Sequence, residues 1–92
     1  MWVGGAAVYP ATIERALYGA PGLADVAAVD VDGRIVVGVV ADSEVDLSSL
    51  LDDLRATLPP LDVPNEIRRL AEIPRNAAGK VHRSELRKVL GP

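Results

Sequence analysis

Apolar and polar positions follow one another along the chain in patterns that predict three helices and three strands. After Pro10, apolar side chains recur at helical spacing, at Ile13, Ala16, Leu17 and Ala20. Proline is favoured in the first turn of a helix, because the N–H that it lacks has no helical partner there. The glycines and proline at positions 19–22 end the segment. We therefore expect a helix that begins at Pro10 and exposes Glu14 and Arg15.

Two runs of mostly β-branched residues, 25–31 and 34–41, flank the dipeptide Asp32-Gly33. Asp-Gly between such runs is typical of a tight β-hairpin, because a type I′ turn needs positive φ at both central positions. The second run is apolar at nearly every position, which indicates a strand that is covered on both of its faces.

A second helix is predicted after Asp46, whose carboxylate can accept hydrogen bonds from the N–H groups of the first turn. Its apolar side chains form one stripe, made by Leu47, Leu50, Leu51, Leu54 and Leu58. Pro59-Pro60 ends this helix. Residues 66–72 predict a short third strand at a sheet edge, because Arg68 and Arg69 interrupt its apolar pattern.

The last segment predicts a helix from about His82 to Leu90, with Leu86, Val89 and Leu90 facing inward. An N-terminal extended segment, residues 1–8, precedes all of these elements. The order αββαβα predicts an α+β fold in which helices pack on one small three-stranded sheet. Because 92 residues suffice for one hydrophobic core and not for two, we expect a single domain over residues 1–92.

Composition narrows the class of protein. The chain has no cysteine, so it has no disulfide framework, thiolate metal site or thiol nucleophile, and we expect no metal site. No apolar run reaches the roughly 18 residues that a membrane-spanning helix needs. The N-terminus lacks the basic-then-apolar pattern of a signal peptide. We therefore expect a cytoplasmic protein without a membrane span.

Charge is distributed unevenly along the chain. Residues 1–63 contain three basic and ten acidic side chains, a net charge of −7, whereas residues 64–92 contain seven basic and three acidic ones, a net charge of +4. A basic third on an acidic domain points to an anionic ligand near the C-terminus. A phosphate-bearing small molecule fits better than nucleic acid, because the basic segment has no aromatic side chain on which bases could stack.

One lysine is singled out by its surroundings. Lys80 lies on a short loop between Pro74 and Val81, with Gly79 directly before it. An ammonium on a flexible stem can reach a carboxylate or phosphate as charge develops there. Gly79 lets the backbone approach a ligand or adopt a positive φ, and Pro74 limits what must be ordered on binding. The alternative interpretation is a solvated surface turn ahead of a helix.

The order of these motifs resembles the C-terminal domain of the AMP-forming (adenylate-forming) ligase superfamily. This superfamily contains the acyl-CoA synthetases, the adenylation domains of peptide synthetases and the luciferases. The resemblance covers nearly all 92 residues and rests on Gly4-Gly5, Val8-Tyr9-Pro10, Ile13-Glu14, Pro64-Asn65-Glu66-Ile67 and Pro74 through Arg83. The Gly-Gly-x-x-Val-Tyr-Pro form is most similar to that of the fatty- and aromatic-acid CoA ligases.

The resemblance implies a catalytic role for Lys80. At this place in the motif, a lysine reaches the carboxylate substrate and the α-phosphate of ATP during adenylation. The resemblance also places Gly4 and Gly5 in a loop that lines the tunnel for the pantetheine arm of CoA after a rotation of the domain. For the two glycines, the alternative is a flexible N-terminal leader.

Further binding residues follow from the same motif. Gly79 would lie against the substrate, and Arg75, Arg83 and Arg87 would help to bind phosphate groups of ATP or CoA. The alternative is that these arginines solvate a helix face or pair with Glu85. We expect the single histidine, His82, to face solvent.

The resemblance finally implies that the chain acts as part of a larger enzyme. The superfamily's large N-terminal domain, which holds ATP, Mg²⁺ and the acid, has no counterpart in these residues. We therefore expect the lid of an ATP-dependent carboxylic acid–CoA ligase in fatty or aromatic acid metabolism, inactive alone and binding no cofactor tightly by itself. Two alternatives stay open: the lid of an adenylation domain that loads a carrier protein, and a stand-alone, non-catalytic interaction module.

Overall fold

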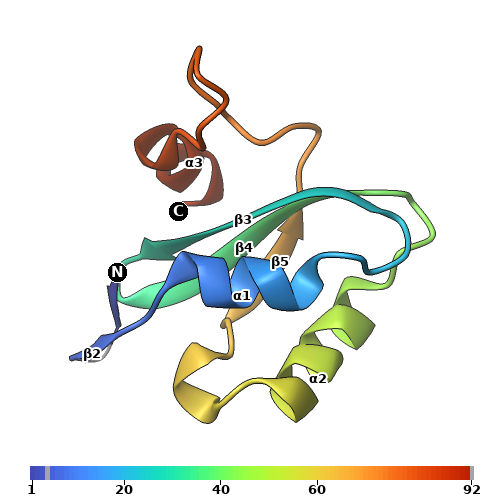
Figure 1. The fold of residues 1–92 in the computed structure, drawn as a ribbon, viewed down its shortest axis with the longest axis vertical. Helices are drawn as coiled ribbons and strands as arrows, with labels where there is room; N and C mark the ends of the chain where they lie inside the picture. Colours follow the sequence, from blue (N-terminus) through green and yellow to red (C-terminus); the bar gives the residue numbers. More distant parts are fainter. Residues whose placement is uncertain (4, 92) are drawn as a thin grey trace.

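The computed structural model of the protein describes residues 1–3 and 5–91. The described residues form these elements in chain order: β1 (Trp2–Val3), β2 (Ala6–Ala7), α1 (Pro10–Leu17), β3 (Leu23–Val31), β4 (Arg34–Ala41), α2 (Leu47–Thr57), the 3₁₀ helix η1 (Pro60–Asp62), β5 (Glu66–Arg69) and α3 (Arg83–Leu90). Figure 1 shows how the helices and the main sheet are arranged. From α1 onward the three α-helices and three longer strands follow the order αββαβα. The α+β prediction is therefore confirmed.

The main sheet has three strands in the order β3-β4-β5. β3 and β4 form the predicted antiparallel hairpin, and β5 runs parallel to β4 at the edge. Asp32 and Gly33 have φ of 50° and 77°, as a type I′ turn requires. The third strand ends at Arg69 and is shorter than the predicted span of 66–72.

Helices cover both faces of this sheet, so the central strand β4 is buried on both sides, as its sequence predicted. Figure 1 shows α1 and α2 on one face and α3 on the other. The first face packs Val8, Ile13, Leu17, Val26, Ala28, Ile35, Val37, Val39, Leu54 and Ile67 into one core cluster. The second face packs Ala27, Val29, Val36, Ile73, Leu86 and Leu90. Neighbouring β3 residues thus alternate between the two clusters.

Two predicted side-chain orientations were wrong. Glu14 of α1 was expected to face water, but it is buried, with 8% of its surface exposed. Val89 of α3 was expected to face inward, but it is 52% exposed. The predicted cap of α2 is confirmed, since the Asp46 carboxylate accepts hydrogen bonds from the backbone N–H groups at the start of the helix.

The N-terminal residues form a small hairpin instead of the extended segment that the sequence predicted. Trp2 pairs with Ala7 and Val3 with Ala6. The backbone N–H of Val8 donates to the carbonyl of Met1 at 2.7 Å. We call residues 1–3 and 5–8 the N-terminal hairpin.

Candidate functional site

The lysine loop, residues 75–81, is a tight hairpin between β5 and α3. Arg75 and Val81 form a single antiparallel bridge. Inside it, the Asn76 N–H donates to the Lys80 carbonyl at 2.8 Å, and the Gly79 N–H donates to the Asn76 carbonyl at 2.9 Å. Gly79 has a φ of +84°. This is the pattern of a three-residue hairpin loop that ends on a left-handed residue, which is why glycine is needed there.

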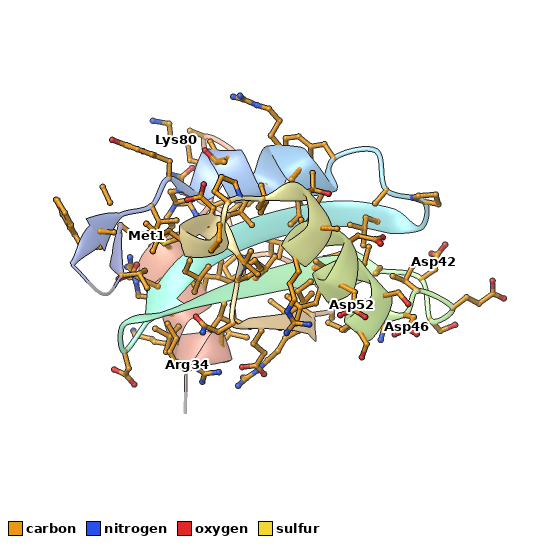
Figure 2. The ribbon with its side chains drawn as sticks, turned by 90° about the horizontal axis from the view of Figure 1, so that it is seen from below. Met1, Arg34, Asp42, Asp46, Asp52 and Lys80 are labelled. Carbon is orange, nitrogen blue, oxygen red and sulfur yellow. The ribbon has the colours of Figure 1, made fainter. Side chains whose placement is uncertain are left out.

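The lysine loop projects away from the core. All residues from Arg75 to Lys80 are exposed, and Figure 1 shows this segment, in dark orange, extending past α3. Figure 2 shows Lys80 at the rim of the molecule, apart from the carboxylates of Asp42, Asp46 and Asp52. The side chain of Lys80 forms no hydrogen bond or ion pair with any residue that the structure describes.

Every other cation in the basic C-terminal third has an internal partner. Two form ion pairs within that third, Arg68 with Glu66 and Lys88 with Glu85. Arg69 donates to two backbone carbonyls. The remaining three pair with acidic side chains of the first 30 residues: Arg75 with Asp25, Arg83 with Glu14 and Arg87 with Asp30. These three pairs offset three of the four excess positive charges of residues 64–92.

Two of these arginines cover the open edge of β3. Arg83 donates to the carbonyl of Ala28, and Arg87 donates to the carbonyl of Asp30. Four residues of helix rise about 6 Å and two residues of strand about 6.6 Å, so the i, i+4 spacing on α3 matches the i, i+2 spacing on β3. The hydrogen bond from Arg87 also holds the pKa of the Asp30 carboxyl below its ordinary value.

Glu14 completes the cover of the same edge from the opposite helix layer. Its Oε2 accepts a hydrogen bond from the Ala28 N–H at 2.9 Å and lies 3.4 Å from Arg83 Nη1. Both backbone groups of Ala28 that β4 does not use are therefore satisfied by charged side chains. A buried carboxylate needs such partners, because burial without them costs several kcal/mol.

Arg75 links the lysine loop to the sheet. Its Nη2 and Nε donate to the two oxygens of Asp25 at 2.7 and 3.3 Å, and its Nη1 donates to the Gly79 carbonyl at 2.8 Å. The hydrogen bond to Asp25 raises the pKa of Arg75 above its already high ordinary value. The binding of phosphate groups by Arg75, Arg83 and Arg87 stays a prediction; none of the three pairs with Glu85.

The predicted glycine site is only partly described. Gly4 lies outside the described residues. Gly5 is exposed with a φ of +82°, and a Cβ built on it would meet no atom within 4 Å. An open hollow of about 420 Å³ lies next to the N-terminal hairpin, and its lining includes Met1, Trp2, Pro10, Arg83 and Arg87. The hairpin and α3 therefore share one concave surface.

Sequence reasoning missed several side chains that organise this region. Asn76 and Asp25 hold the lysine loop, and an Asn-x-x-Gly turn pattern was the available signal for Asn76. His82 is exposed, as predicted, and its Nδ1 also accepts a hydrogen bond from the Glu85 N–H at the start of α3. No sequence signal pointed to the pairing of Asp25, because its partner is 50 positions away.

Two features are absent from the described part of the chain, residues 1–3 and 5–91. No group of three or more His, Cys, Asp or Glu side chains is arranged to hold a metal ion. No helix there has the length and apolar character needed to cross a membrane.

Comparison with known proteins identifies the family that this chain matches. The model of the family described as AMP-binding enzyme C-terminal domain matches residues 12–80. The chain is 40% identical over 96 residues to the mitochondrial malonate–CoA ligase of Mus musculus. The alignment covers 97% of this chain and 16% of that protein. It is 39% identical over 90 residues to an isonitrile lipopeptide synthase of Streptomyces coeruleorubidus, covering 91% of this chain and 6% of that protein.

The fold also matches a solved structure. The Mycobacterium tuberculosis fatty acyl CoA synthetase superposes with a TM-score of 0.89 and 31% sequence identity, covering 100% of this chain and 20% of that one. The chain therefore spans a fifth or less of the length of these relatives.

Proposed function

Because this chain belongs to the family of AMP-binding enzyme C-terminal domains, we propose that it is the lid domain of an ATP-dependent carboxylic acid–CoA ligase. The observation that carries the proposal is that the Lys80 ammonium is exposed and unpaired among the described residues. Among the described residues it is the one cation of the basic C-terminal third without an internal partner, and it stands on an exposed, hydrogen-bonded loop.

Lys80 would act in the first of two chemical steps. The acid's carboxylate oxygen attacks the α-phosphorus of ATP, a new O–P bond forms, and pyrophosphate leaves. Because the attack brings two anions together, a positioned ammonium stabilises the transition state more than the ground state. Gly79 has no side chain at the point where the loop would approach the substrate.

The second step would use the opposite end of the same sheet edge. We propose that the N-terminal hairpin, with Gly4 and Gly5, faces the pantetheine arm of CoA while the thiol attacks the acyl-adenylate and AMP leaves. The hollow shared by the hairpin and α3 supports this proposal, because its lining includes two arginines, Arg83 and Arg87, and one carboxylate, Asp30, which offsets the charge of Arg87. Arg75 would offer a phosphate group the two guanidinium N–H groups that Asp25 and the Gly79 carbonyl leave unused.

The partner in both steps would be a large N-terminal domain that holds ATP, Mg²⁺ and the acid. The length of the relatives supports this assignment, since this chain corresponds to 20% of the fatty acyl CoA synthetase. By itself the chain is then expected to release no pyrophosphate from ATP and a carboxylic acid. A cytoplasmic location stays a prediction.

The proposal is tested in a chimeric ligase in which this chain replaces the matching fifth of the M. tuberculosis synthetase. Lys80→Ala is expected to lower the rate of pyrophosphate release from ATP and a fatty acid by about 100-fold or more, the usual effect of losing a transition-state charge donor. Lys88→Ala is the matched control, because Lys88 is an exposed lysine 75% accessible in its side chain and paired only with Glu85. Equal activity of the two variants would reject the proposal.

The acceptor is decided on the same chimera. The ligase proposal predicts that the acyl group passes to free CoA, whereas an adenylation domain would transfer it to the pantetheine thiol of a carrier protein. The likeness to the lipopeptide synthase favours testing both acceptors side by side. A chain that supports neither reaction in any partner would be a stand-alone interaction module.

A further inference from the structure

We infer that Asn76 and Asp25 are positioning residues that hold Lys80 in its geometry for adenylation. The inference rests on the proposed function of Lys80. Neither side chain was predicted to matter, and neither is expected to touch substrate. Each acts through the backbone of the lysine loop.

Asn76 organises the loop from within. Its side-chain Oδ1 accepts two hydrogen bonds, from the Ala78 N–H at 2.9 Å and from the Lys80 N–H at 3.0 Å. Its own N–H donates to the Lys80 carbonyl at 2.8 Å. Both backbone groups of Lys80 are therefore bound to a single residue, which fixes the direction in which the lysine side chain leaves the loop.

Asp25 fastens the loop to the sheet. The Asp25 carboxylate accepts hydrogen bonds from Nε and Nη2 of Arg75. The Nη1 of the same arginine donates to the Gly79 carbonyl. The carboxylate is itself held, because its Oδ1 accepts the Val26 N–H at 2.9 Å. The chain of contacts runs from β3 through Asp25 and Arg75 to the residue directly before Lys80.

These polar contacts are needed because packing does not shape the loop. All side chains from Arg75 to Lys80 are exposed, so no buried apolar surface offsets the entropy of ordering these residues. A loop without such contacts samples many directions for the lysine. Since a misplacement of about 1 Å can cost about 100-fold in rate, loss of the contacts should appear in the catalytic rate more than in stability.

The first test measures amide hydrogen exchange in the 92-residue chain. Asn76→Ala is expected to speed exchange at the Ala78 and Lys80 amides about fivefold, the factor that corresponds to one net hydrogen bond. Asn76→Ser keeps a weaker acceptor oxygen, so its exchange rates at these amides are expected to lie between those of the unchanged chain and those of Asn76→Ala. Glu66→Gln is the control, because it weakens an ion pair on β5, outside the lysine loop, and is expected to leave exchange at both amides unchanged. The same variant serves as the matched control for Asp25→Asn below, since the Glu66–Arg68 and Asp25–Arg75 pairs have the same distance (2.7 Å in both) and similar exposure. Unchanged exchange in Asn76→Ala would overturn the inference.

The second test measures adenylation by the chimeric ligase. Asn76→Ala is expected to lower kcat for pyrophosphate release about tenfold or more, and Asp25→Asn about threefold, with KM for ATP nearly unchanged. Glu66→Gln is expected to leave kcat unchanged. Both losses are expected to shrink below about twofold when Lys80 is already alanine, because residues that act through one group are not additive.

The double variants separate positioning from general support of the fold. If Asn76→Ala costs the same factor with and without Lys80, the residue supports the domain and does not position the lysine, and the inference fails. If Lys80→Ala alone leaves adenylation intact, the proposed function fails instead, whatever Asn76 does. The two failures are therefore distinct.

Discussion

Glu14 and Arg83 meet on the backbone of Ala28, although they are 69 positions apart in the chain and belong to helices on opposite faces of the sheet. The carboxylate accepts the Ala28 N–H, and the guanidinium donates to the Ala28 carbonyl and to the carboxylate. Together they bind backbone groups at the open edge of β3. Without such partners, the free N–H and C=O groups of an edge strand are available to pair with another chain. This contact joins α1, β3 and α3.

We expect Glu14→Ala to destabilise the domain markedly. The substitution leaves the buried Ala28 N–H without its acceptor and Arg83 without its charge partner. Such a loss costs about 1–3 kcal/mol of the free energy of unfolding, toward the lower end because Arg83 can be partly rehydrated. Glu14→Gln, which keeps an acceptor oxygen, should lose less.

Urea unfolding of the 92-residue chain measures both variants. Arg15→Ala is the control, because its side chain is exposed next to Glu14 and makes no described hydrogen bond; its effect should stay within about 0.5 kcal/mol. If Glu14→Ala were as stable as Arg15→Ala, the contact at Ala28 would contribute nothing to stability.

Truncation to alanine is expected to destabilise the domain strongly at Leu86 of α3 and very little at Val89. Leu86 is fully buried in the second core cluster, so Leu86→Ala should cost about 2–5 kcal/mol of unfolding free energy. Val89 is 52% exposed, so Val89→Ala should change stability by less than about 0.5 kcal/mol. Thermal or urea unfolding distinguishes them, and a large loss in Val89→Ala would mean that α3 is rotated from its described orientation.

Gly79 is required for its backbone conformation and not for space. Its φ is +84°, and a Cβ at this position would meet no atom within 4 Å. Gly79→Ala should therefore cost about 1–2 kcal/mol, the penalty of a left-handed conformation, and Gly79→Asn less, because asparagine tolerates it. Gly79→Val should be the worst of the three. Urea unfolding ranks the variants, and identical stabilities would show that the loop does not depend on this conformation.

The Asp30–Arg87 pair should make stability depend on acid. The hydrogen bond from Arg87 lowers the pKa of Asp30 below 3.8, its ordinary value. A carboxyl with a lowered native pKa stabilises the fold above its unfolded pKa and loses that contribution as the pH falls through the native pKa. Urea unfolding of both proteins, measured at intervals of about half a pH unit from about pH 5 to about pH 2.5, checks this prediction. Asp30→Asn should lose less unfolding free energy over this range than the unchanged protein. Parallel pH profiles of the two proteins would contradict this.

Local patterns were enough to predict the three α-helices and the three strands of the main sheet, although not the N-terminal hairpin. The Asp32-Gly33 turn, the cap at Asp46 and the leucine stripe of α2 each depend on residues close together in the chain. The same holds for the lysine loop, whose proline, glycine and lysine lie within seven positions. These features could be predicted because spacing and backbone preference determine them.

Charged side chains were harder to interpret. The basic C-terminal third predicted an anionic ligand, but Arg75, Arg83 and Arg87 each pair with a carboxylate of the first 30 residues. Glu14 was predicted to face water, because helical spacing does not show which segments pack against the helix. Only the packing of α1 and α3 around β3 brings these charges together.

The order of the three α-helices and the three main strands, the family motifs and the position of Lys80 follow from neighbours along the chain, and so they could be read from the sequence. Which cations are paired within the domain, and which one faces outward, follows from the folded structure. For Arg75, Arg83 and Arg87 the pairing depends on contacts across 50 to 69 positions, and such long-range ion pairs exist only once the sheet and its two helix layers have formed.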